Sequence, residues 1–215
     1  MSDVILRVND LRMGFAGGVG ERGMVFPAVD GIGFEIRAGE TFALLGESGC
    51  GKSVTALSLL RLLPSAGRIL GGEVLFAGRD LLQLPEAGMR AVRGGGMAMI
   101  FQEPATSLNP VLTVGRQIGE VLERHLVLSG DVVRQRAIEL LDAVGIADAK
   151  RRLEEFPFQL SGGMRQRVMI AMALAGNPKL LIADEPTTAL DVTIQAQIMD
   201  LLLALNHDQG VTLII

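Results

Sequence analysis

This sequence of 215 residues contains no tyrosine, no tryptophan and a single cysteine. The one cysteine, Cys50, cannot form an intrachain disulfide, and a cysteine-rich zinc or iron–sulfur site is excluded as well. This cysteine usage fits a reducing, cytoplasmic compartment. Because tyrosine and tryptophan are absent, any aromatic contact to a ligand must come from the eight phenylalanines.

Long apolar runs and an excess of positive charge are also lacking. The longest apolar run, residues 168–176, is far shorter than the roughly 18 residues of a membrane-spanning helix. The first ten residues show no basic segment followed by an apolar one, so we expect no signal peptide. The net charge of −4 argues against a nucleic-acid-binding face. With 49% apolar residues, the chain is expected to fold around a packed core.

Apolar patterns typical of strands alternate with patterns typical of helices along the chain, which predicts an α/β fold with a mainly parallel sheet. A polar helical stretch at residues 114–144 interrupts this alternation and is interpreted as an inserted helical subdomain. Residues 14–23 are glycine-rich and are expected to form a loop. The expected strands are 4–8, 32–36, 41–45, 72–77, 97–101, 180–183 and 211–215, and the other expected helices are 53–63, 164–175 and 194–205.

The strongest local motif matches the pattern G-x-x-x-x-G-K-[ST] between an expected strand and an expected helix. Glycines let backbone N–H groups turn inward as an anion nest, and the helix that follows points its positive end at the same place. A lysine adds positive charge for the β- and γ-phosphates, and the final hydroxyl can bind Mg²⁺. The plainer alternative is a glycine-rich turn before a helix. The motif comprises Gly46, Glu47, Ser48, Gly49, Cys50, Gly51, Lys52 and Ser53.

Two acidic residues follow the apolar strand expected at residues 180–183. The carboxyl ends of parallel strands meet at one edge of a sheet, so Asp184 and Glu185 are expected beside the phosphate-binding loop. Asp184 is suited to holding Mg²⁺, directly or through water, and Glu185 to orienting and polarising an attacking water. A strand that ends in solvated acids is the simpler alternative.

A serine and two glycines, Ser161, Gly162 and Gly163, stand at the start of another expected helix. This arrangement can form a second anion-binding site. Two such sites in one chain suggest a sandwich in which each subunit covers the nucleotide of its partner. A helix cap with a flexible turn explains the stretch equally well.

Together these residues resemble the ATP-binding cassette family. Residues 46–53 look like its Walker A motif, residues 160–166 like its signature, and the strand before Asp184 like its Walker B motif. Residues 189–191, ending at Asp191, look like its D-loop, and Gln102 looks like its Q-loop glutamine. The resemblance implies that Gln102 senses the γ-phosphate, contacts Mg²⁺ and communicates with a transmembrane partner.

The same resemblance implies a fold, a cofactor set and partners. The expected fold is a P-loop nucleotide-binding core across residues 1–215, with an N-terminal antiparallel β subdomain and a helical subdomain at about 106–158. The expected ligands are ATP and Mg²⁺. The expected partners are a second ATPase subunit, identical or different, transmembrane permease subunits and, indirectly, a solute-binding protein. The chain is then expected to lie on the cytoplasmic face of the inner membrane, with no nucleic acid bound.

Further segments are similar to one branch of that family. Residues 101–110, 163–174 and 189–198 resemble importers of dipeptides, oligopeptides, glutathione or nickel chelates. In the family an aromatic residue near the first strand usually stacks on adenine, and here Phe15 is the first candidate and Phe26 the second. Phe15 is equally compatible with a place in the core.

The family's switch histidine follows a strand like the one at residues 211–215, where this sequence stops, and neither His125 nor His207 has the right position. We therefore expect a shortened subunit that binds ATP and hydrolyses it poorly. Three alternatives remain: a DNA-repair or chromosome-organising ATPase, a translation-factor ATPase, and a non-catalytic regulatory product. The short interval from Ser53 to Leu160, without coiled coils, argues against the first, and the single head argues against the second.

Overall fold

The computed structural model describes residues 3–17, 24–188 and 191–215. The chain divides into two compact units, residues 1–90 and 91–215. Helix α2, Glu86–Val92, runs across the boundary between them.

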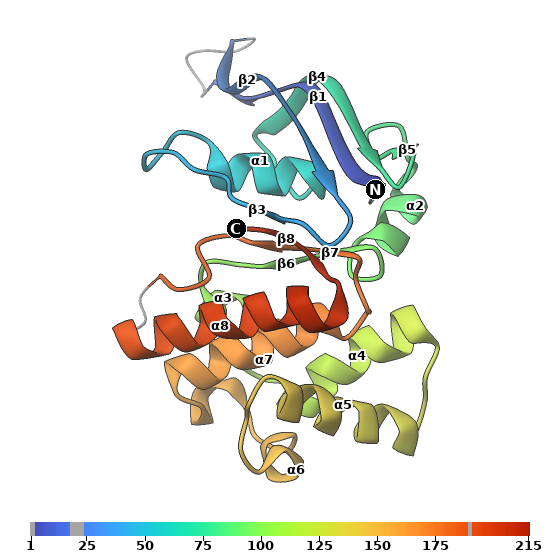
Figure 1. The fold of residues 1–215 in the computed structure, drawn as a ribbon, viewed down its shortest axis with the longest axis vertical. Helices are drawn as coiled ribbons and strands as arrows, with labels where there is room; N and C mark the ends of the chain where they lie inside the picture. Colours follow the sequence, from blue (N-terminus) through green and yellow to red (C-terminus); the bar gives the residue numbers. More distant parts are fainter. Residues whose placement is uncertain (1–2, 18–23, 189–190) are drawn as a thin grey trace. The chain divides into compact units, whose positions relative to one another are not determined.

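The first unit is built on an antiparallel sheet with strand order β2-β1-β4-β5 (Figure 1). Strand β1 (Val4–Ala16) pairs on one side with β2 (Val25–Arg37) and on the other with β4 (Gly67–Phe76), which is followed by β5 (Arg79–Asp80). Alternating side chains of β1 form the core of this unit together with β2 and β4. These core residues are Leu6, Val8, Leu11, Met13, Ile36, Val74 and Phe76.

Strand β1 extends well past residue 8, where the apolar alternation predicted its end. The register shifts between Val8 and Leu11, and Asp10 has a positive φ of 46°. This bulge places two consecutive polar residues, Asn9 and Asp10, in the middle of the strand, and they break the period-two pattern that marks a strand in sequence. Residues 14–16, expected in a loop, are the end of this strand, and residues 18–23 lie outside the described residues.

The segment that holds the phosphate-binding motif also belongs to the first unit. Strand β3 is only Thr41–Phe42, shorter than expected, and helix α1 is Lys52–Leu59. Residues 43–51 connect the two without regular structure. The motif therefore has the predicted context, a strand before it and a helix after it.

The second unit contains three parallel strands in the order β8-β7-β6. These are β6 (Met97–Ile100), β7 (Leu180–Ala183) and β8 (Thr212–Ile214). All four residues of β7 are buried, as expected for a strand with a neighbour on each side. Helices α7 (Gly162–Leu174) and α8 (Val192–Gln209) share one hydrophobic core with alternating residues of this sheet. Those residues are Ala98, Ile100, Leu181, Ala183 and Leu213.

Short helices fill most of the stretch from residue 104 to residue 159. They are α3 (Pro104–Ser107), α4 (Val114–Leu126), α5 (Asp131–Ala143), α6 (Ala149–Arg152) and the 3₁₀ turn η1 (Pro157–Gln159). Helix α4 buries Val114, Ile118 and Leu122, which lie four residues apart on one face. The expected helical stretch 114–144 is thus two helices, separated after Val127, whose φ is 55°. In the described part of the chain, no helix combines the length and apolarity needed to cross a membrane.

Candidate functional site: a glycine-rich loop and a clustered carboxylate

The loop before α1 depends on glycine at two positions. Gly49 and Gly51 have φ angles of 82° and 98°, a region that L side chains rarely adopt. A Cβ at Gly51 would also lie 2.8 Å from the carbonyl oxygen of Ala28. Gly51 is the N-cap of α1 and offers no side chain to its first turn. Glycine at this cap therefore leaves the helix start accessible to an external anion.

Lys52 folds back over the same loop. Its Nζ donates to the carbonyl oxygens of Gly46 at 2.8 Å and Glu47 at 3.0 Å. The positive charge is therefore held among the backbone groups of the motif. An incoming phosphate would meet an ammonium and a helix start at one place, which is the combination that phosphate-binding loops use.

The residues of this loop fit a nucleotide phosphate and its magnesium ion. Ser53 follows Lys52 in the first turn of α1, where a hydroxyl oxygen is a hard donor that suits Mg²⁺. Among the residues that the structure describes, no group of three or more His, Cys, Asp or Glu side chains could hold a metal alone. A magnesium ion at Ser53 would therefore take several of its ligands from phosphate oxygens and water.

In the second unit, the end of β7 brings two predicted site residues into contact. The backbone N–H of Asp184 still bonds to the Ile100 carbonyl at 3.0 Å, so the sheet ladder continues to this residue. The Gln102 side chain then donates from Nε2 to Glu185 Oε2 at 2.8 Å. Gln102 lies just after β6 and Glu185 just after β7, and these neighbouring parallel strands place them together.

Sequence reasoning missed Thr188, whose hydroxyl donates to the same carboxylate oxygen of Glu185 at 3.0 Å. The Thr188 backbone N–H also bonds to the Glu185 carbonyl at 3.1 Å, which closes a tight turn. Glu185 has a φ of 45°, an unusual value for a residue with a side chain. The carboxylate is thus held by two donors and by a constrained backbone. A threonine after a Pro-Thr pair gives no distinctive sequence signal for this role.

The predicted signature residues form a helix start. Ser161 caps α7, and its hydroxyl accepts from the Met164 N–H at 3.3 Å. Gly162 is the first residue of the helix, two residues earlier than expected from the sequence. A Cβ at Gly163 would lie 3.1 Å from the Ile194 side chain of α8, so a glycine suits this close approach. The geometry agrees with a cap, and the role in binding a partner's nucleotide stays a prediction.

Asp191 likewise caps α8, because its carboxylate accepts from the Ile194 N–H at 2.9 Å. Ala189 and Leu190, which precede it in the predicted D-loop, lie outside the described residues.

Phe15 is partly buried near the end of β1, opposite Phe26, which is 48% exposed. Neither position decides between adenine stacking and packing.

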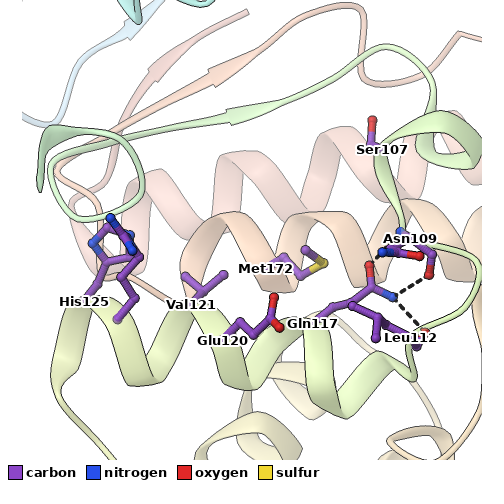
Figure 2. A pocket seen from close by; sticks show the side chains of 9 residues that line it. Ser107, Asn109, Leu112, Gln117, Glu120, Val121, His125 and Met172 are labelled. Carbon is purple, nitrogen blue, oxygen red and sulfur yellow. Dashed lines mark hydrogen bonds between the residues drawn. The ribbon is translucent and has the colours of Figure 1, made fainter. Parts of the chain in front are cut away.

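A pocket of about 320 Å³ lies in the second unit beside α4 (Figure 2). Among its lining residues, Gln117 accepts from the Asn109 N–H at 2.8 Å and donates to the carbonyls of Asn109 and Leu112 at 3.1 and 3.0 Å. Gln117 thus connects α4 to the backbone of residues 109–112, in the loop before this helix. His125 also lines this pocket.

The predicted site residues are divided between the two units of the chain. Gln102, Glu185 and Thr188 form one cluster within the second unit. The loop from Gly46 to Ser53 belongs to the first unit. The approach of that loop to Asp184 and Glu185 stays a prediction.

Known proteins that are similar to this chain include ATP-binding proteins of transport systems. Relatives include the peptidoglycan transport ATP-binding protein YejF of Agrobacterium fabrum, which is 56% identical over 98% of this chain and 38% of its own length. A probable peptide ABC transporter ATP-binding protein, y4tR, of Sinorhizobium fredii is 55% identical over 97% of this chain and 62% of its own length. The oligopeptide transport ATP-binding protein OppD of Bacillus subtilis is 50% identical over 96% and 60%. This chain therefore spans less than two thirds of the length of these relatives.

Solved structures agree on the fold. The ATP-binding cassette MJ0796, in a dimeric post-hydrolysis state bound to ADP and Pi, matches with a TM-score of 0.83 at 30% identity, over 97% of this chain and 86% of that one. The protein cbiO1 from Clostridium perfringens, part of the transporter complex cbiONQ, matches with a TM-score of 0.78 at 29% identity, over 99% and 77%. The family model described as ABC transporter matches residues 29–188. Because that match covers well over half of the 215 residues, the chain belongs to the ATP-binding cassette (ABC) transporter family.

Proposed function

We propose that this chain is the ATP-binding subunit of an ABC importer and that it binds and hydrolyses Mg-ATP. The observation that supports this best is the loop from Gly46 to Ser53, in which Lys52 is held over a glycine-lined helix start. In the proposed complex, backbone N–H groups of the loop and the Lys52 ammonium bind the β- and γ-phosphates. Mg²⁺ would be held by Ser53, with Asp184 and Gln102 nearby, and would neutralise phosphate charge.

For hydrolysis, Glu185 orients a water molecule against the γ-phosphorus. The water oxygen forms a bond to phosphorus, the bond to the β–γ bridging oxygen breaks, and the proton of the water passes to the Glu185 carboxylate. The hydrogen bonds from Gln102 and Thr188 keep that carboxylate in one orientation. Both bonds end on Oε2, and Oε1 is proposed to face the water.

The names of the relatives support a proposal for the partners and the cargo. Dimeric MJ0796 supports a pair of ATPase subunits. In the proposed pair, Ser161–Gly163 and Asp191 of one chain would contact the nucleotide of the other. As an importer subunit, the chain is also proposed to bind transmembrane permease subunits and to act with a solute-binding protein. Its proposed location is the cytoplasmic face of the inner membrane. The names of the relatives include peptide, oligopeptide and peptidoglycan transport, which favours a peptide as cargo. Nickel chelates and glutathione are the alternatives within this branch.

The test replaces Glu185 with glutamine. Glu185→Gln keeps a side chain of the same size but cannot accept the proton, so we expect ATP binding to remain and phosphate release to fall by about 100-fold or more. Nucleotide affinity and phosphate release are measured on the same preparations. Loss of binding in this variant, or unchanged phosphate release, would contradict the role given to Glu185.

A further inference from the structure

The turn that follows Glu185 is held from two different helices by glutamine side chains. Gln166 of α7 donates from Nε2 to the carbonyl oxygen of Pro186 at 2.7 Å. Gln195 of α8 donates from Nε2 to the next carbonyl oxygen, that of Thr187, at 3.1 Å. Consecutive backbone carbonyls are thus bound by side chains from two separate elements.

The surroundings make the bond from Gln166 costly to lose. Gln166 is 1% exposed and Pro186 is also buried, so water has little access to the carbonyl if the amide is removed. A buried acceptor that loses its donor is unfavourable, because the carbonyl stays desolvated without a hydrogen bond. After loss of the Gln166 amide, we expect the turn to move so that the Pro186 carbonyl reaches another donor or water. Because Pro186 directly follows Glu185, such a movement would displace the carboxylate.

The backbone of Glu185 has a conformation that its surroundings must maintain. Its φ of 45° is unfavourable for a residue with a Cβ and persists only when the surrounding structure enforces it. The donors on the carboxylate, Gln102 and Thr188, fix the end of the side chain. The two glutamines fix the main chain that follows it.

We infer that Gln166 and Gln195 are positioning residues for Glu185, acting through the carbonyls of Pro186 and Thr187. This inference rests on the proposed ATPase function. The two helices are capped by Ser161 and Asp191, the residues proposed to meet the nucleotide of a partner subunit. Each glutamine lies within the first two turns of its helix. A shift of either helix start would therefore reach the turn of Glu185 through one helix segment and one hydrogen bond.

The experiment compares Gln166→Met and Gln195→Met with the unchanged chain. Methionine has a similar length and no N–H donor, so the packing is largely kept. We expect kcat for ATP hydrolysis to fall about tenfold or more in Gln166→Met, with KM changed less than twofold, because a small displacement of the reacting group is enough. The smaller effect is expected for Gln195→Met, whose side chain is less buried. The control is Gln135→Met, which removes an exposed glutamine that bonds to Glu139 of its own helix.

A second variant separates positioning from general stability. In Gln166→Glu the carboxyl can donate to the Pro186 carbonyl only when it is protonated. Its kcat, relative to that of the unchanged chain, should therefore rise as the pH is lowered. The folded fraction is measured by circular dichroism at each pH, because a merely structural role would change the apparent kcat only in proportion to the folded fraction.

Hydrogen exchange makes the test independent of turnover. The amides of residues 184, 185, 187 and 188 should exchange faster in Gln166→Met, while those of β6 should be unchanged. If the unchanged chain shows no hydrolysis, the proposed function fails, and the exchange of residues 184–188 still decides the positioning role. Unchanged exchange in Gln166→Met, a kcat within twofold of the unchanged chain, or the same loss in Gln135→Met would each overturn the inference.

Discussion

Gly51 and Glu185 both have positive φ angles, and the two residues tolerate them for different reasons. Gly51 has no Cβ, so a φ of 98° costs it little, and the space where a Cβ would lie is taken by a neighbouring carbonyl. Glu185 does have a Cβ, and its φ of 45° is maintained by hydrogen bonds to its carboxylate and to the turn after it. The sequence predicts the first case, because the glycine belongs to a recognisable motif. The second cannot be predicted, because side-chain amides such as Gln166 show no spacing pattern.

Alanine at Gly51 should destabilise the first unit and prevent nucleotide binding. The new Cβ would be strained by the positive φ and would lie 2.8 Å from the Ala28 carbonyl oxygen. The strain of φ alone is about 1–2 kcal/mol, and the close contact adds to it. Gly78→Ala is the matched control, since Gly78 has a φ of 77° but nothing within 4 Å of the added atom. Thermal unfolding should show a larger loss for Gly51→Ala, and equal losses would argue against the close packing of this loop.

His125 should make the second unit less stable in mild acid. Burial lowers the pKa of His125, and the neighbouring Arg124 charge lowers it further. The ring lies against the loop before β6, where a Cβ at Gly94 would be 2.6 Å from its Nε2. A group whose pKa is lowered by folding contributes stability above its ordinary pKa, and that contribution is lost as the pH falls through the lowered value.

The check is an NMR titration together with urea unfolding at pH 7.5 and pH 5. The imidazole midpoint should lie below the ordinary value of about 6.5. His125→Gln should show a weaker dependence of unfolding free energy on pH than the unchanged chain. A midpoint at or above the ordinary value would refute the packing argument.

At the scale of elements, apolar periodicity predicted the central strand and most helices, and it was least accurate at their ends. Residues 180–183 were predicted as a buried strand, and β7 has these bounds. Helix α8 runs to Gln209, beyond the expected end at Leu205, because Gly210 with a φ of 66° ends it instead. Helix α7 begins at Gly162 because Ser161 caps it there. Caps and turns decide these boundaries, and the apolar pattern does not include them.

The loop between α3 and α4 should depend on Gln117, whose side chain makes three hydrogen bonds to the backbone of residues 109–112 (Figure 2). Gln117 is only 5% exposed, and Gln117→Met would remove the side-chain partner of one backbone N–H and two backbone carbonyls. The expected loss of unfolding free energy is about 1–3 kcal/mol. The measurement is chemical denaturation, with exposed Gln135→Met as the reference substitution. A loss no larger than that of the reference would show that water replaces these bonds.

At the scale of the whole molecule, the order of the motifs predicted the family, and the family model confirms it over residues 29–188. The antiparallel and the parallel sheets were also predicted, because the resemblance implies both. The sequence could not predict how Gln102 and Gln166 hold the Glu185 turn, since they lie 83 and 20 positions from the residues that they contact. Long-range contacts between common side chains have no local signature.

The most direct test of this account is titration calorimetry of the folded chain with ATP and Mg²⁺. The account predicts saturable heat with about one nucleotide for each chain. Lys52→Ala removes the ammonium that lies over the loop and should weaken binding about tenfold or more, since hydrogen bonds to charged groups contribute roughly 1.5–3 kcal/mol. Circular dichroism verifies that both proteins are folded. Absence of binding heat in the folded, unchanged chain, or equal affinity in Lys52→Ala, would contradict the central claim that residues 46–53 bind the phosphates of ATP.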